Sequence, residues 1–170
     1  MTLDVREIEP AEIDLVLDYF LDATPEHLEL MGVDPTRLPP RDEWRRRIKE
    51  DLARPVEQRR GLVVLWLRDG EPVGFSTCSD IAFGEHAKLH LHVLKPEDRN
   101  GGVGAPCVRR SAQIYLERLQ LKRLFSEPNA FNVAPNRTLQ KAGFTYVKTH
   151  MTVPGWINYH QPVTRWVMQR

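Results

Sequence analysis

The chain has 170 residues, of which 41% are hydrophobic and 28% charged, and its formal net charge is +1. This balance gives no electrostatic reason to expect a nucleic-acid or anionic-membrane partner, and no apolar run approaches the ~20 residues that span a bilayer. The first residues lack the apolar stretch of a secretory signal, and two cysteines make no disulfide scaffold. We therefore expect one cytoplasmic domain over residues 1–170.

The first sixty residues are predicted to form one strand and two helices. The strand is expected near residues 3–8, and a helix opens at Pro10 and ends before Pro25. Residues 25–41 contain four prolines, so we expect a loop with at most one helical turn, of the long kind that often has a function. A second helix follows, with Asp42 as its N-cap. Apolar residues repeat at helical spacing in the first helix: Ile13, Val16, Leu17, Phe20 and Leu21.

The remaining elements surround a glycine-rich loop. Residues 62–67 and 72–81 form a hairpin, because Asp69-Gly70 between them supplies the positive φ that a tight turn needs. A strand over 88–93 leads into the loop, and a helix opens near Pro106. Further strands are expected at 123–126, 144–153 and 163–168, and a short helix at 135–142. This β-α-α-β-β-β-α-β-α-β-β order describes an α/β (α+β) chain with a mixed, mostly antiparallel sheet and helices on both sides.

The most informative motif is Arg99-Asn100-Gly101-Gly102-Val103-Gly104. It lies between a strand and a helix, an arrangement that places backbone N–H groups and the positive end of a helix dipole around a phosphate. Glycine permits the close approach and the positive φ values that such a loop requires. The motif therefore predicts a ligand with a phosphate or pyrophosphate, and the alternative is a flexible helix-start loop without a ligand.

Two nucleotide-binding classes fit the glycines less well. Gly102-x-Gly104-x-x-Cys107 approaches the dinucleotide fingerprint of nicotinamide-dependent reductases, but the third glycine is missing and residues 94–100 separate the motif from its strand. A phosphate-loop nucleotide hydrolase is excluded because no Gly-Lys-Ser/Thr follows.

The spacing Arg-x-x-Gly-x-Gly resembles the acyl-CoA pyrophosphate loop of the GNAT acyltransferase superfamily. A second segment agrees in order and distance: Ser126-Glu127-Pro128-Asn129-Ala130-Phe131-Asn132, followed by Leu139-Gln140-Lys141-Ala142-Gly143-Phe144. It looks like the later strand, the CoA-side asparagine and the end of the last helix in that family. The resemblance covers roughly residues 60–170. It implies a GNAT-like twisted sheet of about seven strands flanked by about four helices, with acetyl-CoA as acyl donor and no metal.

The resemblance also implies which residues hold the donor. A backbone N–H near Val93 or Leu94 would polarise the thioester carbonyl, and Asn132 would bond the pantetheine arm. Arg137 is a candidate for the nucleotide end of CoA, although a solvated helix face explains it equally well. The expected cofactor contacts are Val93, Leu94, Arg99, Asn100, Gly101, Gly102, Val103, Gly104, Asn132 and Arg137.

Two residue types are candidates for proton transfer. His90 and His92 alternate on one face of the 88–93 strand, and an imidazole there could take the proton of an attacking ammonium. His92, nearer the strand end, is the better candidate; the alternative is a pair hydrogen-bonded within the protein. A metal site built on them would need further ligands, and no compact cluster supplies these. Glu127 could be a base or an ammonium anchor, or simply a charge at a strand end.

The chain departs from the family pattern at the expected general acid. Many relatives have a tyrosine where this chain has Leu139, and others a serine where it has Pro135. Tyr159 or water would then protonate the leaving thiolate, or it would leave unassisted, since a thiol has a pKa not far above neutral. Cys107 in a helical first turn would have a lowered pKa, but free cysteines are usually small buried hydrophobes.

The resemblance therefore predicts an N-acetyltransferase in which a primary amine attacks acetyl-CoA directly, with catalytic roles for His92, Glu127 and the Val93 amide. The acceptor is a small-molecule or peptide amine, and segments 25–41 and 154–162 are expected to shape its site. A non-catalytic CoA-binding sensor or scaffold is the alternative that the missing tyrosine favours. A homodimer through the C-terminal strands is compatible with the sequence.

Overall fold

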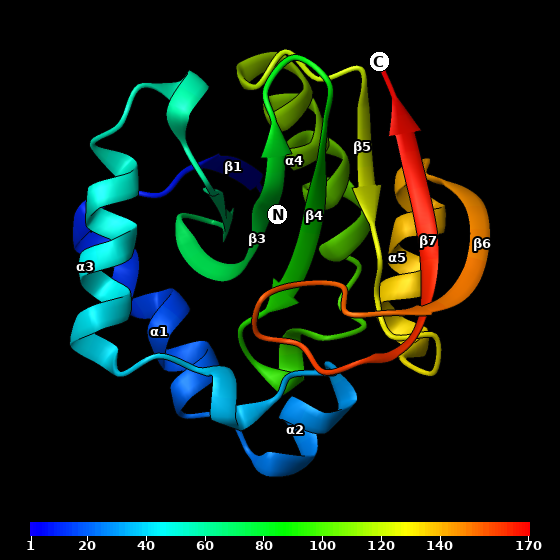
Figure 1. The fold of residues 1–170 in the computed structure, drawn as a ribbon, viewed down its shortest axis with the longest axis horizontal. Helices are drawn as coiled ribbons and strands as arrows, with labels where there is room; N and C mark the ends of the chain where they lie inside the picture. The colour runs from blue at the N-terminus through cyan, green and yellow to red at the C-terminus, as the bar shows by residue number, and fades with distance from the viewer.

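The computed structural model describes residues 1–170 and contains one seven-stranded sheet (Figure 1). Its strands are β1 (Leu3–Glu7), β2 (Leu62–Arg68), β3 (Glu71–Ala82), β4 (His86–Val93), β5 (Arg123–Ser126), β6 (Thr145–Thr152) and β7 (Gln161–Gln169). Their order across the sheet is β1-β2-β3-β4-β5-β7-β6. Every neighbouring pair is antiparallel except β4 and β5. The predicted mixed, mostly antiparallel sheet is confirmed.

Five α-helices accompany the sheet, where about four were expected. They are α1 (Ile13–Leu21), α2 (Pro25–Leu30), α3 (Arg41–Leu52), α4 (Gly104–Arg118) and α5 (Val133–Ala142), with 3₁₀ turns η1 (Pro10–Glu12), η2 (Pro35–Arg37), η3 (Val56–Gln58) and η4 (Pro96–Asp98). None of them combines the length and apolar character needed to cross a membrane. The additional helix is α2, within the segment predicted to be mostly loop.

The start of α2 explains why a helix forms where the prolines led us to expect a loop. Pro25 occupies the first helical position, where its missing N–H costs nothing and its fixed φ is suitable. The Thr24 hydroxyl caps the helix by accepting a hydrogen bond from the backbone N–H of His27 at 3.2 Å. A residue that ends one helix therefore begins the next. The N-cap of α3 also differs from the prediction, because Pro40 takes that position and Asp42 lies inside the first turn.

Two hydrophobic cores lie on opposite faces of the sheet. Along β2, Val64 and Trp66 belong to the core under α4 and α5, whereas Leu65 and Leu67 belong to the core under α1–α3. This alternation is the two-residue period of a strand buried on both faces. Figure 1 shows α4 behind the central strands, with α1 and α3 on the other side of β1–β3. The sheet thus separates the α4 side of β4 from the α1 side.

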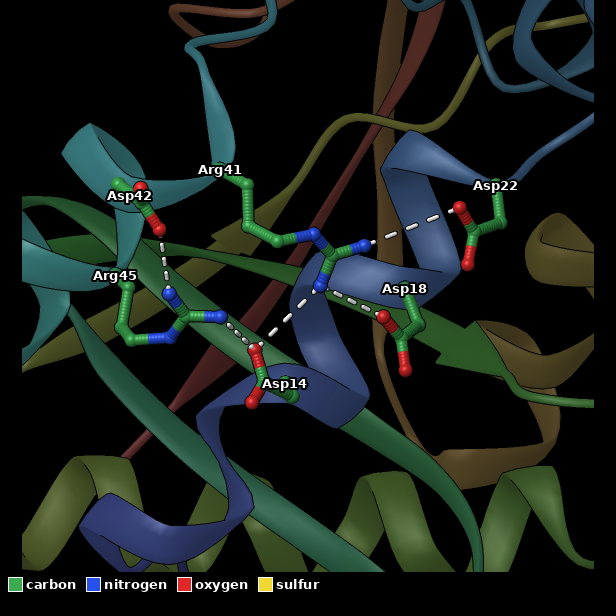
Figure 2. A network of polar contacts seen from close by, with 6 residues as sticks. All are labelled: Asp14, Asp18, Asp22, Arg41, Asp42 and Arg45. Atoms are coloured by element: carbon green, nitrogen blue, oxygen red, sulfur yellow. Dashed lines mark hydrogen bonds and ion pairs between the residues drawn. The ribbon is translucent and has the colours of Figure 1, made fainter.

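Ion pairs fix α3 against α1 (Figure 2). Asp14 and Asp18 of α1 and Asp22 at its C-cap recur every four residues and all face Arg41, whose nearest contact is 2.8 Å to Asp18. Arg45, one turn further along α3, lies 2.6 Å from Asp14. Single exposed pairs contribute at most about 1 kcal/mol, but here two arginines share several carboxylates. The network holds α3 so that its apolar side faces α1.

The sheet splits between β4 and β5. These strands pair only from His86 to Lys88, and beyond that point no ladder joins them. At the split, the Ser126 hydroxyl donates to the carbonyl of Leu89 at 2.6 Å. The β6–β7 connection reaches toward this open end and contacts the region after α2, where Asp34 N–H donates to the carbonyl of Ile157 at 2.8 Å (Figure 1).

Candidate functional site

A cleft of about 800 Å³ occupies the gap between β4 and β5. Its walls come from β4, the glycine-rich loop, the start of α5 and the α1–α2 region. Ten of the sequence-predicted residues line it: His92, Val93, Arg99, Asn100, Gly102, Val103, Gly104, Glu127, Asn132 and Arg137. Leu94 and Gly101 do not line the cleft.

The glycine-rich loop presents an open helix N-terminus to the cleft. Positive φ occurs at Asn100 (68°) and Gly102 (76°), which turns the chain into α4. No side chain caps α4 at Val103, so the amides at its start are left for a ligand. The amide of Gly101 is different, because it donates to the carbonyl of Asp98 at 3.2 Å. Gly101 therefore serves the turn, and its expected contact with the cofactor is not supported.

Arg99 reaches across the cleft to α2. Its Nη2 lies 3.2 Å from Nε2 of His27, and the Tyr19 hydroxyl lies 3.1 Å from the same nitrogen. A guanidinium can only donate, so Nε2 of His27 must be unprotonated. Burial and the Arg99 charge both lower the pKa of His27, which agrees with a neutral ring. This link between the loop and α2 was not predicted, because nothing in the sequence pairs residues 72 positions apart.

One backbone hydrogen bond establishes which amides of β4 face the cleft. Leu94 N–H donates to the carbonyl of Val73 at 3.0 Å, on the β3 side. Successive residues of a strand direct their backbone groups to opposite edges. The N–H groups of Val93 and Leu91 therefore point toward the β5 side, where the ladder has already ended. The N–H of Leu94 is therefore used within the sheet, which disfavours the predicted cofactor contact there, whereas the N–H of Val93 faces the cleft.

His92 lies where aromatic rings and the cleft meet. Its ring centroid is 4.9 Å from Tyr19, 5.0 Å from Phe20 and 4.9 Å from Phe75. No protein group hydrogen-bonds its ring nitrogens, and neither nitrogen is shut off from the surface. Burial, and secondarily the neighbouring His90 and His27, lower the pKa of His92 well below its usual value. The ring is therefore neutral near pH 7 and accessible as a proton acceptor.

His90 is held more firmly. Its Nε2 lies 2.9 Å from the Ser79 hydroxyl. Burial, with the charge of Lys88, lowers the pKa of His90 to about 4. The alternative of a histidine satisfied within the protein thus describes His90 better than His92. No group of three metal-ligating side chains lies together around either ring.

The Glu127 carboxylate is engaged by two cationic or polar partners. Lys88 Nζ lies 2.7 Å from one oxygen and His150 Nε2 lies 3.2 Å from the other, and the side chain is only 3% exposed. Lys88 also approaches Asp80 at 3.5 Å and donates to the carbonyl of Pro154 at 3.3 Å. These contacts tie β4, the end of β5 and the β6–β7 segment together. They favour a positioning role for Glu127 over the proposed role as base.

The two positions at which relatives are expected to have a general acid are occupied here by Leu139 and Pro135, which have no proton to donate. Leu139 is fully buried in the core, and Pro135 lines the cleft without a donor. The Tyr159 hydroxyl donates to the carbonyl of Glu29 at 3.1 Å and does not line the cleft. The one tyrosine that does is Tyr19 of α1, which sequence reasoning read only as part of a helix.

Both cysteines are buried and neither lines the donor cleft. Burial raises the pKa of Cys107 to about 11, against the lowering effect of the nearby Arg110 charge. Burial also raises the pKa of Cys78. The burial of both thiols agrees with the predicted role in packing.

A second cavity, of about 530 Å³, lies on the α1 and α3 side of β4. The two cavities share four lining residues, Met31, His90, His92 and Asn158. The predicted acceptor segments both contribute, through Met31 and Val33 from one and residues 155–158 from the other. The two cavities therefore lie next to each other, and His92 is one of the residues that borders both.

The model of the acetyltransferase (GNAT) domain family matches residues 2–145. Among curated protein sequences, none is significantly similar to this chain.

Several solved structures share the fold. The ribosomal L7/L12 alpha-N-protein acetyltransferase RimL, in complex with coenzyme A, superposes with a TM-score of 0.76 at 16% identity, covering 99% of this chain and 94% of that one. A spermidine N-acetyltransferase from Vibrio cholerae, in complex with CoA and spermine, gives 0.75 at 13%, with coverages of 98% and 95%. The aminoglycoside acetyltransferase AAC(6')-Ib, in complex with ribostamycin and coenzyme A, gives 0.75 at 14%, with coverages of 100% and 94%.

Proposed function

The chain belongs to the GNAT acetyltransferase domain family, and on this basis we propose that it transfers an acetyl group from acetyl-CoA to a primary amine in a ternary complex. The observation that carries the proposal is the continuity of the cleft. It runs from the uncapped N-terminus of α4 to the unpaired edge of β4, and it shares His92 and three other lining residues with the second cavity. This arrangement supports separate sites for the phosphate, the thioester and the amine.

The donor would bind along the cleft from the loop to the edge of β4. The pyrophosphate would accept hydrogen bonds from the amides at the start of α4 and from Arg99. The pantetheine arm carries amides, which suit the free backbone groups of Leu91 and Val93. Asn132 and Arg137 line the α5 end of the cleft, where they would contact the arm and the nucleotide end.

The chemistry needs a proton acceptor, an oxyanion donor and a leaving group. The amine lone pair attacks the thioester carbon while His92 accepts the amine proton, and the Val93 N–H stabilises the oxyanion. Collapse of the tetrahedral intermediate breaks the C–S bond and releases CoA as a thiolate. Its protonation by water suffices, because a thiol is a far better leaving group than an alcohol.

A non-catalytic CoA-binding protein is the second candidate. The observation that favours it is the replacement of the family's acid by Leu139, whose side chain lies in the core and cannot act on a ligand. The two candidates share the donor cleft and differ only in turnover.

A two-step experiment separates these functions. Thermal melting with acetyl-CoA, NADH or ATP comes first, and we expect a shift with acetyl-CoA alone, since ligand at ~100 times its Kd stabilises by roughly 2.7 kcal/mol. CoA release over a panel of primary amines comes second. Release supports the transferase, a shift without release supports the binding protein, and a shift with NADH alone would favour a reductase and overturn both.

A further inference from the structure

We propose that the acceptor is a small monoamine whose amino group is carried on an aromatic body, bound in the second cavity with its nitrogen at His92. This inference rests on the proposed function and specifies its substrate class. It comes from two properties of the cavity. Aromatic rings lie in a row along it, and every carboxylate that lines it already has an ion-pair or hydrogen-bond partner.

Aromatic side chains run in contact from His92 to the mouth of the cavity. His92 packs on Phe20 at 5.0 Å between ring centroids, Phe20 on Trp44 at 5.5 Å, and Trp44 on Trp156 at 5.6 Å. All four line the cavity. Flat, polarisable walls of this kind favour an aromatic guest over a hydrated aliphatic chain.

Trp156 marks the outer end of this row. The residue is 51% exposed in a protein whose other three tryptophans are buried. An exposed indole placed edge-on against Trp44 leaves apolar surface that a ligand would cover. The neighbouring residues Val16, Val33 and Ile48 continue the apolar lining.

The charges of the cavity argue against a polycation. Each lining carboxylate already has partners: Glu50 pairs with Arg46 at 2.8 Å, Asp80 with Lys88 at 3.5 Å, and Asp51 accepts two backbone N–H groups at 2.9 Å. Three arginines also line the cavity: Arg47, Arg54 and Arg60. A second or third ammonium would lose its water without gaining a free carboxylate, which is costly.

The two observations together distinguish this cavity from one suited to polyamines or aminoglycosides. A single amino group can give its proton to His92 as it attacks, and the rest of the molecule needs only apolar contact. Any additional positive charge would lie among paired carboxylates and arginines.

The test compares acceptors that differ in one feature. 2-Phenylethylamine, ethanolamine, spermidine and ribostamycin are each assayed for CoA release with saturating acetyl-CoA. We expect kcat/KM for 2-phenylethylamine to exceed that for ethanolamine by at least about 10-fold, because burying a phenyl ring contributes on that order. It should exceed that for spermidine and ribostamycin as well. Equal or better turnover of either polycation would overturn the inference.

Calorimetry keeps this result separate from the proposed function. If no amine releases CoA, the transferase proposal fails, but 2-phenylethylamine should still bind the CoA-loaded protein and ethanolamine should not. Absence of binding by 2-phenylethylamine would overturn the inference.

Substitutions at Trp156 test where 2-phenylethylamine binds. Trp156→Ala should raise KM for 2-phenylethylamine about 10-fold or more and leave KM for acetyl-CoA unchanged, and Trp156→Phe should restore most of the loss. Tyr146→Ala removes a comparably exposed ring that lines neither cavity and should change neither constant. An unchanged KM in Trp156→Ala would contradict the assigned place of the aromatic body.

Discussion

Leu94 donates its backbone N–H to the carbonyl of Val73 at 3.0 Å, and this bond determines the direction of every amide before it on β4. Because the directions alternate, Val93 presents its N–H to the open side of the split sheet. The two neighbouring amides are therefore unequal: one belongs to the sheet and the other to the cleft.

Proline substitutions test this difference between the Val93 and Leu94 amides. Val93→Pro removes an N–H that no strand uses, so the sheet should persist while kcat falls about 10²–10³-fold, the usual cost of a lost oxyanion donor. Leu94→Pro removes a ladder bond and should mainly lower the melting temperature. Steady-state kinetics and thermal melts of both variants are the measurements. Equal kinetic losses per folded molecule would contradict the assignment to Val93.

His92 and His90 offer a second matched pair. His92→Gln should reduce kcat by about 10²-fold or more, since the accessible imidazole is lost, while the Kd for acetyl-CoA is preserved. His90→Gln keeps a group able to hydrogen-bond Ser79 and should reduce kcat much less. The comparison requires rates at saturating acetyl-CoA and donor binding by calorimetry. A loss below threefold in His92→Gln would remove His92 from the role of base.

The structure of the glycine-rich loop could be predicted from sequence because its signal is local. Residues 99–104 are contiguous, and the glycines, the arginine and the following helix carry one physical meaning together. The alternation of Leu89, His90, Leu91 and His92 likewise fixed which side chains share a face of β4. Leu89 and Leu91 accordingly pack with the core under α4, and His92 packs on Phe20 and Phe75 of the other core.

What could not be predicted depends on tertiary contacts. His27 meets Arg99, and Tyr19 meets His92, only because α1 and α2 fold back over the end of β4. Glu127 looked like a free carboxylate because neither Lys88 nor His150 is near it in sequence. Leu94 was indistinguishable from Val93 until its hydrogen bond to β3 was visible.

The ion pairs of Glu127 predict a stability effect. Glu127→Gln leaves the Lys88 ammonium beside a neutral amide, and breaking a buried pair costs about 3 kcal/mol or more. For a chain of this size that corresponds to a fall of roughly 6–12 °C in Tm. Replacing both residues, as in Lys88→Met with Glu127→Met, should cost less than Glu127→Gln alone. A loss of activity above 100-fold at unchanged Tm would instead identify Glu127 as the base.

The lowered pKa values of the half-buried His90 and His92 predict acid sensitivity. The pKa of His90 falls to about 4 in the folded state, whereas an unfolded chain titrates near 6.5. Between these values the unfolded state binds more protons, so the histidine's contribution to stability is complete above pH ~6.5 and is lost as the pH falls toward 4. His92 shifts in the same direction. When the pH is lowered from 7.5 to 5.0, the Tm of the wild type should therefore fall by more than the Tm of a His90→Gln/His92→Gln variant. An equal fall in both proteins would contradict this.

Arg99 should contribute to binding only through the nucleotide half of the donor. Its guanidinium lies at the loop that faces the expected pyrophosphate and lies within reach of His27 in α2. A charged hydrogen bond is worth about 1.5–3 kcal/mol, so Arg99→Gln should raise the Kd for CoA about 10- to 100-fold, with the difference shrinking as salt increases. The KM for S-acetylpantetheine, which lacks the nucleotide, should stay the same. His27→Ala removes the competing partner of Arg99 and should leave the Kd for CoA equal or lower. If Arg99→Gln weakened both donors equally, the arginine would be acting on the thioester end or on the fold, and the placement of the pyrophosphate at this loop would be wrong.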